Sequence, residues 1–372
     1  MAEVVDIRTV AEPRDVIHRA VAFLSEGKLV ALPTETDYVV AAHGSNPAAV
    51  EELTGMSEET SFSLCIKGCE ELLDYFPNLN PFSCKFLSRC WPGPVEILLP
   101  RQMEMGLFRV FPEKASRAVS VGNDVRLRVP ASKIVLAVLH FLPSPMVISS
   151  GIDSQNRFTL AKEVDSHYGD QISLIIDNGP VPLEQSPTVV RLDEEKWETV
   201  RTGAVSNLEL KRSASDMYLF VCTGNTCRSP MAEGLFRKIL AEKLQCSPEE
   251  ITERGFSVAS AGIAAATGYP ASPESVDLMA RKKIDLTSHA SQPLTEQLAH
   301  ECDKIYTMTK SHRDSILAAW PELADRVELL SREGHDISDP IGGGRREYEL
   351  CEEEILRGVE SIVDEILSER SH

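Results

Sequence analysis

Residues 221 to 230 read Val221-Cys222-Thr223-Gly224-Asn225-Thr226-Cys227-Arg228-Ser229-Pro230. The apolar run 217–221 leads into this stretch and predicts a buried strand, and apolar positions at helical spacing follow it over 231–244. A tight loop between a strand and a helix directs several backbone N–H groups and the positive end of the helix at one point. The sequence therefore predicts an anion-binding loop.

The residue types in this loop indicate phosphate chemistry. Cys222 and Arg228 enclose five residues, which allows the loop to wrap a tetrahedral phosphate. A helix N-terminus and nearby cations lower the pKa of a thiol from about 8.5, so we expect Cys222 to supply a thiolate nucleophile. Arg228 can hold two phosphate oxygens, and the Ser229 hydroxyl can donate to the Cys222 sulfur. We expect Gly224 and Asn225 to supply the positive φ that so tight a loop needs.

Three other interpretations of the loop are weaker. A nucleotide-binding Walker loop would need Gly-Lys-Ser/Thr at a set spacing, which is missing. A zinc site would need a second Cys or His pair near Cys222 and Cys227, and none has a matching spacing. A purely structural turn with two buried cysteines stays open as the alternative to catalysis.

The loop resembles the phosphate-binding loop of the low-molecular-weight protein tyrosine phosphatase family, whose pattern is Cys, five residues, Arg, Ser or Thr, and Pro. The resemblance covers about residues 216–370 and implies a doubly wound parallel sheet. It implies that Cys222 attacks phosphorus, that Arg228 holds the transition state, and that a phosphocysteine intermediate forms. Asp339, in the glycine-rich loop 336–344, matches the general acid that later acts as a base.

The resemblance also assigns supporting residues. It gives phosphate binding to the rest of the loop, namely Thr223, Gly224, Asn225, Thr226, Cys227 and Ser229. Ser260, in Ser260-Ala261-Gly262, and His289 match positions that brace Asn225 and so fix the loop conformation. The stretch Tyr306-Thr307-Met308-Thr309 is a further match. The implied chemistry uses no metal and no cofactor.

Two residues bear on the substrate, which we expect to be a phosphorylated protein. Thr226 resembles the bacterial protein-arginine phosphatase branch, and a hydroxyl there suits a polar phosphoguanidinium better than a phenyl ring. Ile341 takes the place of an aromatic residue found in most relatives, which weakens the case for phosphotyrosine and also departs from the arginine branch. Tyr348 or Tyr269 could replace that aromatic wall. Phosphoarginine is modestly favoured over phosphotyrosine, and both stay open.

Cys227 carries a second hypothesis. It lies close enough in sequence to Cys222 to form a reversible disulfide that protects the nucleophile from over-oxidation. A small buried residue is an equally good interpretation.

Length and composition set the frame for the whole chain. At 372 residues the chain is long for one core, so we expect two domains. A net charge of −19 argues against binding to nucleic acid or to a membrane surface. No apolar run reaches about 18 residues, and nine cysteines at irregular spacing fit a reducing compartment. We expect a cytoplasmic protein.

The first half alternates helical and extended patterns. Helical spacing predicts helices at 13–26, 47–55, 81–90 and 131–141. Short apolar runs predict strands at 28–32, 61–66, 95–99, 125–129, 145–149, 171–176 and 187–192. The alternation predicts an α/β domain.

This half resembles the threonylcarbamoyl-AMP synthase (YrdC-like) family, with its twisted mixed α/β sheet, over about residues 4–206. The matching residues are Pro33-Thr34-Glu35-Thr36 with Tyr38, Trp91-Pro92-Gly93-Pro94, Arg126-Leu127-Arg128-Val129-Pro130 and Arg201-Thr202-Gly203-Ala204.

Departures from that family fall on its nucleotide-binding residues. The Lys-x-Arg that binds phosphates is replaced around Thr54-Gly55-Met56-Ser57, so both cations are missing. The Asn of the nucleotide loop has become Ile152, and Tyr-Gly-Leu has become Tyr38-Val39-Val40. Each lost charge-assisted contact costs about 1.5–3 kcal/mol. We expect loss of ATP-dependent synthase activity, which leaves a small-molecule or nucleotide-binding module, a scaffold for phosphatase substrates, or a synthase with altered contacts.

The expected organisation is therefore a YrdC-like domain over 1–206, a linker over 207–216 and a phosphatase domain over 217–372. Apolar residues at helical spacing predict a closing helix over 347–369. The favoured function is a cysteine-dependent protein phosphatase. The alternative is a nucleotide-binding or tRNA-modification factor whose phosphatase half is regulatory.

Overall fold

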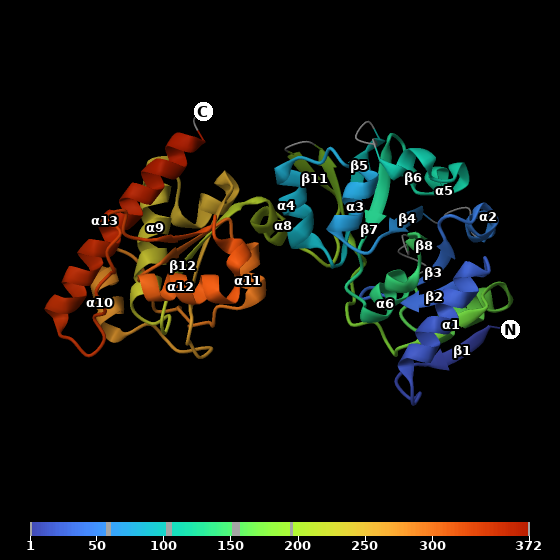
Figure 1. The fold of residues 1–372 in the computed structure, drawn as a ribbon, viewed down its shortest axis with the longest axis horizontal. Coiled ribbons are helices and arrows are strands. Elements are labelled where there is room, and N and C mark those ends of the chain that lie inside the picture. The colour runs from blue at the N-terminus through green and yellow to red at the C-terminus, as the bar shows by residue number, and fades with distance from the viewer. Residues whose placement is uncertain (1, 57–60, 102–105, 151–156, 194–195, 371–372) are drawn as a thin grey trace. The chain divides into compact units, whose positions relative to one another are not determined.

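The computed structural model describes residues 2–56, 61–101, 106–150, 157–193 and 196–370 (Figure 1). The chain divides into two compact units, Met1–Ser213 and Ala214–His372. The division falls within the stretch expected to be a linker, most of which forms helix α8 (Asn207–Ala214). Ser206 and Glu209 cap the start of this helix through reciprocal side-chain to backbone bonds, and Leu210 is fully buried.

The described part of the first unit forms one mixed sheet of 11 strands, in the order β1-β9-β2-β3-β8-β4-β7-β5-β10-β11 with β6 paired to β7. The strands are β1 (Glu3–Asp6), β2 (Val30–Pro33), β3 (Tyr38–His43), β4 (Ser61–Cys65), β5 (Val95–Pro100), β6 (Ser120–Val121), β7 (Asp124–Arg128), β8 (Met146–Ser150), β9 (Leu174–Asp177), β10 (Thr188–Asp193) and β11 (Lys196–Arg201). The sheet contains both parallel pairs, such as β4 with β7, and antiparallel pairs, such as β4 with β8. The expected mixed α/β fold is confirmed.

Helices cover this sheet and bury their apolar stripes. They are α1 (Pro13–Ser25), α2 (Pro47–Gly55), α3 (Cys69–Tyr75), α4 (Pro81–Cys90), α5 (Glu113–Ala118), α6 (Lys133–Phe141) and α7 (Ala161–Tyr168), with 3₁₀ turns η2 (Leu107–Val110) and η3 (Gly169–Gln171). Helix α1 buries Val16, Ile17, Ala20 and Leu24 in a core shared with α6. This face is the one that the helical spacing predicts.

A buried ion cluster holds the loop between β2 and β3. Arg128, on β7, is wholly buried, and its Nη1 donates to Asp37 Oδ1 at 3.3 Å. Its Nη2 donates to Glu35 Oε1 at 3.1 Å and to the Thr36 hydroxyl at 2.7 Å. Burial pushes the pKa of Asp37 upward, but the guanidinium and the Thr36 and Thr34 hydroxyls outweigh it, so the pKa lies below 3.8.

The second unit is built on a four-stranded parallel sheet in the order β13-β12-β14-β15. The strands are β12 (Asp216–Cys222), β13 (Phe256–Gly262), β14 (Lys304–Thr307) and β15 (Val327–Leu329). The helices are α9 (Arg228–Leu244), α10 (Pro273–Arg281), α11 (Glu296–Glu301), α12 (Lys310–Ala319) and α13 (Arg345–Glu369), with 3₁₀ turns η4 (Pro248–Arg254) and η5 (Pro321–Leu323).

Helices lie on both faces of this sheet (Figure 1). Successive residues of β12 point to opposite faces, so Phe220 packs with α9, α10 and α13. Leu219 and Val221 pack on the other face with Ile316 of α12 and Ala299 of α11. The sheet is therefore doubly wound, as expected, and the chain reverses direction across it at the carboxyl end of β12.

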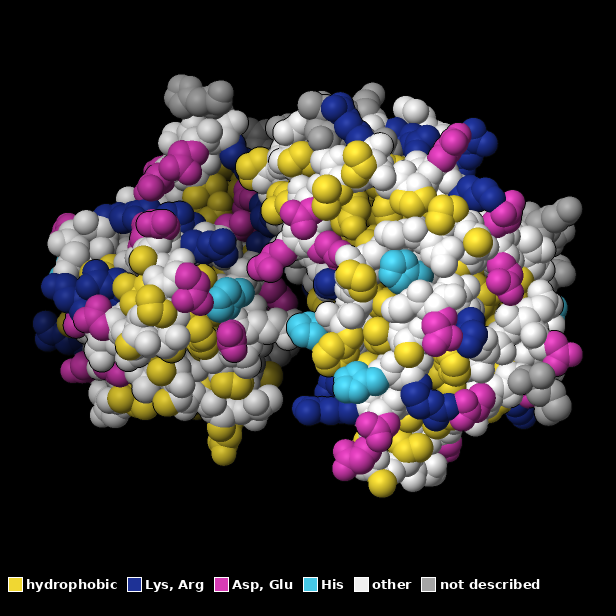
Figure 2. All heavy atoms as spheres, turned by 45° about the vertical axis from the view of Figure 1, so that its right-hand side comes forward, with side chains coloured by type: hydrophobic (Ala, Val, Ile, Leu, Met, Phe, Trp, Pro, Cys, Tyr) yellow, Lys and Arg dark blue, Asp and Glu magenta, His cyan; other side chains and the backbone are white. Residues whose placement is uncertain are grey.

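Two surface features bear on partners. On the face shown in Figure 2, Lys and Arg side chains are interspersed with Asp and Glu side chains. No helix within the described residues is both long and apolar enough to cross a membrane.

We predict that Asp37→Asn lowers the free energy of unfolding of the first unit by about 3–5 kcal/mol, because it leaves the buried Arg128 undercompensated. In a Trp320→Phe background, the fluorescence of Trp91 and Trp197 during urea unfolding reports on this unit. The folded-state pKa is depressed, so the Asp37 contribution is present above pH 3.8 and should fade as the pH falls through the folded-state pKa.

The double variant Asp37→Asn with Arg128→Gln is the matched control. It removes both charges of the pair and should lower the free energy of unfolding by less than the sum of the losses in Asp37→Asn and Arg128→Gln alone. Strictly additive losses would show that the two charges do not depend on each other.

Candidate active site

The loop between β12 and α9 surrounds the Cys222 sulfur with donors. The backbone N–H of Asn225 donates to Cys222 Sγ at 3.2 Å, and the Ser229 hydroxyl lies 3.0 Å from the sulfur. Helix α9 begins at Arg228, three residues earlier than the sequence predicts, so its positive end faces the loop. Cys222 is only 3% exposed. The sulfur is thus buried within hydrogen-bond reach of a backbone N–H and a hydroxyl.

Asn225 fixes the shape of the loop. It adopts φ +54° and is wholly buried. Its Nδ2 donates to the hydroxyls of Ser229 and Ser260, both at 2.9 Å. Its Oδ1 accepts from the backbone N–H of Gln292 at 2.9 Å, and its carbonyl oxygen accepts from His289 Nε2 at 2.8 Å. Ser260 and His289 therefore lie where the resemblance implies, and Gln292 is an addition that no sequence signal marked.

A glycine is required next to this loop, but not at Gly224. Gly224 does not have a positive φ, and a Cβ there would meet nothing closer than 3.6 Å, so the expectation for it was wrong. Gly262, at the end of β13, is the demanding position, because a Cβ there would lie 2.6 Å from the Thr223 carbonyl oxygen. The neighbouring strand must approach the loop this closely to bring Ser260 to Asn225.

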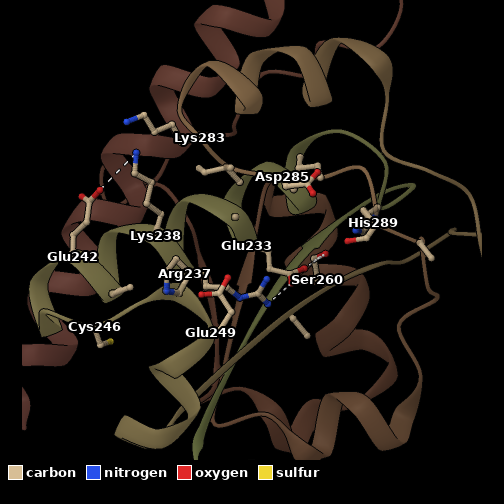
Figure 3. A pocket seen from close by; sticks show the side chains of 18 of the residues that line it. Glu233, Arg237, Lys238, Glu242, Cys246, Glu249, Ser260, Lys283, Asp285 and His289 are labelled. Carbon is tan, nitrogen blue, oxygen red and sulfur yellow. Dashed lines mark hydrogen bonds and ion pairs between the residues drawn. The ribbon is translucent and has the colours of Figure 1, made fainter.

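A cavity of about 590 Å³ is lined in part by Ser260, His289 and Gln292, the residues that hydrogen-bond Asn225 (Figure 3). Ser260 Oγ donates to Glu233 Oε2 at 2.7 Å, and Arg237 donates to Glu233 Oε1 at 2.7 Å. Both bonds are drawn on the cavity wall in Figure 3, with His289 to one side. Cys222 is not among the described residues that line this cavity.

Arg228 joins the loop to the segment that carries Asp339. Its guanidinium is 4% exposed, and its Nη2 donates to Asp339 Oδ2 at 2.5 Å. Nη1 donates to the Ile337 carbonyl at 3.3 Å, and Nη2 also reaches the Thr223 hydroxyl at 3.5 Å. The Asp339 side chain is 46% exposed. The structure thus brings Asp339 to the loop that contains Cys222 and Arg228, although Asp339 lies 111 residues after Arg228 in the sequence.

The remaining loop residues lie against other segments. Thr226 is half-buried, and its carbonyl oxygen accepts from the Ser272 N–H at 2.8 Å. Its hydroxyl lies 3.7 Å from the sulfur of Cys227, which in turn lies 3.4 Å from the Tyr348 hydroxyl. Cys222 and Cys227 are both free thiols, and the protective disulfide stays a hypothesis.

The proposed aromatic replacements for Ile341 differ in their environments. Tyr348 is 4% exposed, and its hydroxyl lies 3.4 Å from the Cys227 sulfur. Burial and the contact with Cys227 raise the pKa of Tyr348 to about 12. Tyr269 and Ile341 are 61% and 71% exposed. Of the two tyrosines, Tyr269 has the more accessible ring, and the replacement of the aromatic wall by either one stays a hypothesis.

In the first unit, Arg128 is a residue of the YrdC-like match, and Asp37 and Glu35 already compensate its charge. Thr54 and Gly55 lie at the end of α2, where the resembling family has cations. Ser57 and the altered nucleotide loop 151–155 lie outside the described residues. Within the described parts of the chain, no group of three or more His, Cys, Asp or Glu residues is arranged to hold a metal ion.

Comparison with known proteins finds relatives of both units. The family model described as low molecular weight phosphotyrosine protein phosphatase matches residues 218–372, and the Sua5/YciO/YrdC model described as telomere recombination matches residues 22–203. A probable low molecular weight protein-tyrosine-phosphatase, EpsP, of Ralstonia nicotianae is 38% identical over 149 residues, which are 40% of this chain and 94% of that protein. The protein-arginine-phosphatase of Bacillus subtilis is 33% identical over 156 residues, which are 41% of this chain and 97% of that protein.

The first unit has its own relatives. The threonylcarbamoyl-AMP synthase of Pyrococcus abyssi is 28% identical over 201 residues, which are 53% of this chain and 56% of that protein. A solved structure of P. abyssi Sua5 aligns at a TM-score of 0.50 and 21% identity, covering 80% of this chain and 93% of that one, which is a likeness of fold. The chain therefore belongs, through its second unit, to the low molecular weight phosphotyrosine protein phosphatase family of hydrolases, and this unit is fused to a YrdC-like first unit.

Proposed function

We propose that Cys222 is the nucleophile of a protein phosphatase that works through a phosphocysteine intermediate. The observation that carries this proposal is the position of the sulfur, which lies under the Asn225 N–H and beside the Ser229 hydroxyl at the start of α9. The sulfur attacks phosphorus, a sulfur–phosphorus bond forms, and the bond to the leaving oxygen or nitrogen breaks. Water then attacks the phosphocysteine, which releases phosphate and restores the thiolate.

Arg228 and Asp339 complete this cycle. Arg228 binds two oxygens of the transferring phosphoryl group, and the backbone N–H groups of residues 223–227 bind the others. Arg228 and Asp339 form an ion pair in this structure, so a phosphate that enters the loop competes with Asp339 for the Arg228 guanidinium. Once displaced from Arg228, the Asp339 carboxylate takes up a proton from solvent and donates it to the leaving group, and afterwards it takes a proton from the attacking water. Ser229 orients the sulfur, and Ser260 and His289 hold Asn225.

The substrate we propose is a phosphorylated protein, with phosphoarginine ahead of phosphotyrosine. The names of the relatives divide between the two, since EpsP is named for tyrosine and the B. subtilis protein for arginine. Thr226 adds a hydroxyl to the loop, and the Tyr348 side chain is buried. A hydroxyl at this position suits a polar guanidinium better than a phenol, and Ile341 in place of an aromatic residue weakens ring stacking with a phenol. All nine cysteines are free thiols, which supports our proposal of a reducing cytoplasmic setting.

For the first unit we propose a small-molecule binding module that no longer makes an adenylate. Two cations of the resembling family are absent, and Arg128 is wholly buried between carboxylates. A triphosphate would thus meet few uncompensated positive charges.

We predict that Cys222→Ser lowers kcat for p-nitrophenyl phosphate by at least about 10,000-fold, because a serine hydroxyl is not ionised under the same donors. Wild-type hydrolysis should be inhibited by vanadate and should persist in EDTA. Cys246→Ser, at a half-buried cysteine beyond the end of α9, is the control and should keep its activity. Equal activity of the two variants would refute the assignment of the nucleophile.

We expect Thr226→Ile to shift the preference from phosphoarginine towards phosphotyrosine peptides by about tenfold in the ratio of kcat/KM, since one polar contact is replaced by an aliphatic one. Turnover of matched peptides measures this ratio. Thr252→Ile, in η4 and away from the loop, is the control substitution. An unchanged preference in Thr226→Ile would remove the argument from this hydroxyl.

The first unit should neither bind ATP tightly nor form an adenylate. Calorimetry of the full chain with ATP and threonine should give no saturable heat below millimolar ligand, because the phosphate-binding cations are missing. Formation of threonylcarbamoyl adenylate in a product assay would instead favour the tRNA-modification alternative.

A further inference from the structure

His312 is a buried titratable group beside the catalytic loop that the chemistry described so far does not use. It lies in the first turn of α12, where its backbone N–H donates to the capping hydroxyl of Thr309. Helix α12 follows β14, the strand next to β12, and this places His312 at the carboxyl edge of the sheet. The ring is 8% exposed, and its Nε2 lies 2.9 Å from the Thr223 hydroxyl.

The hydroxyl of Thr223 links His312 to Arg228. A guanidinium has only donors, so at 3.5 Å the Thr223 oxygen accepts from Arg228 Nη2. The hydroxyl proton is then free to point at His312 Nε2, 2.9 Å away. An imidazole that accepts at Nε2 is neutral and carries its proton on Nδ1, which is buried without a hydrogen-bond partner in the described structure.

The charges around the ring favour the neutral form. Burial lowers the pKa of His312 below 6.5, and Arg228 lowers it further, whereas Asp339 and Asp336 oppose this effect. The Asp336 carboxylate also accepts a hydrogen bond from the backbone N–H of Lys310, so the positive end of α12 compensates part of its charge. A proton on His312 would place a second cation across Thr223 from Arg228 and would compete for the same oxygen.

We propose that neutral His312 is a positioning residue, which orients the Thr223 hydroxyl so that its oxygen holds the Arg228 guanidinium in place for the phosphoryl group. This inference rests on the proposed function of the second unit. His312 acts through Thr223, and we assign it no contact with the reacting atoms. Phosphoryl transfer consequently slows when the ring takes up a proton.

Two substitutions separate this role from simple packing. His312→Leu fills space but accepts no hydrogen bond, so kcat for p-nitrophenyl phosphate should fall about tenfold with a smaller change in KM. His312→Gln offers an amide oxygen to Thr223 and should recover kcat to within about threefold of wild type. Thr223→Val should resemble His312→Leu, and the double variant should be no worse than either single variant.

The pH profile supplies a readout that packing alone would not move. As the pH falls below 6.5, kcat/KM of wild type should decrease through an ionisation that the pH profile of His312→Gln does not show. His300→Gln is the matched control, because its ring lies on α11 and bonds to the Glu296 carbonyl and Glu322. By NMR, the His312 ring should take up its proton at a lower pH than the His300 ring, whose pKa these contacts raise.

Profiles of the same shape in wild type, His312→Gln and His312→Leu would overturn the positioning role. Equal kcat in wild type and His312→Leu would also overturn it. Either result leaves the proposed phosphatase intact if wild type is active and Cys222→Ser is not. An inactive wild type would instead refute the proposed function itself.

Discussion

The left-handed turn at Asn225 is the constraint on which the catalytic loop depends. A non-glycine residue at φ +54° carries a conformational cost of about 1–3 kcal/mol, and it keeps this conformation only where its surroundings hold it there. Four hydrogen bonds to the side chain and carbonyl of Asn225 offset that cost at about 1 kcal/mol each. Because the turn is held, the Asn225 N–H points at the Cys222 sulfur before any phosphate arrives. The site therefore needs little reorganisation when charge develops.

The doubly wound sheet explains why residues distant in sequence meet at this loop. Parallel strands end at the same edge, and the segments that follow β12, β13, β14 and β15 carry Arg228, His289, His312 and Asp339 in turn. The chain reverses direction at β12, and this opens the edge between its neighbours, where ligands bind in folds of this kind. Each strand thus supplies one part of a single site, and the close approach of β13 at Gly262 fixes how near those parts can come.

Local patterns were sufficient to predict the elements that depend on near neighbours. The strand, loop and helix around Cys222, the helices α2 and α4 and the final helix α13 follow from residues a few positions apart. Contacts between distant segments were not predictable in the same way. Gly224 looked like the special glycine, whereas the steric demand falls on Gly262 from another strand, and Tyr348 looked available until its contact with Cys227 appeared. Burial of Leu210 likewise turned an apparent linker into α8.

Two arginines show why a matching residue is not yet a matching site. Arg128 and Arg228 are both buried, and both pair with an aspartate. The partner of Arg128 is Asp37, which is wholly buried, so an incoming anion would have to strand a carboxylate in the interior. The partner of Arg228 is Asp339, whose side chain is 46% exposed and can exchange the guanidinium for water at small cost. We therefore expect a phosphate to replace the carboxylate partner of Arg228 more readily than that of Arg128, because Asp339 can return to water whereas Asp37 is wholly buried.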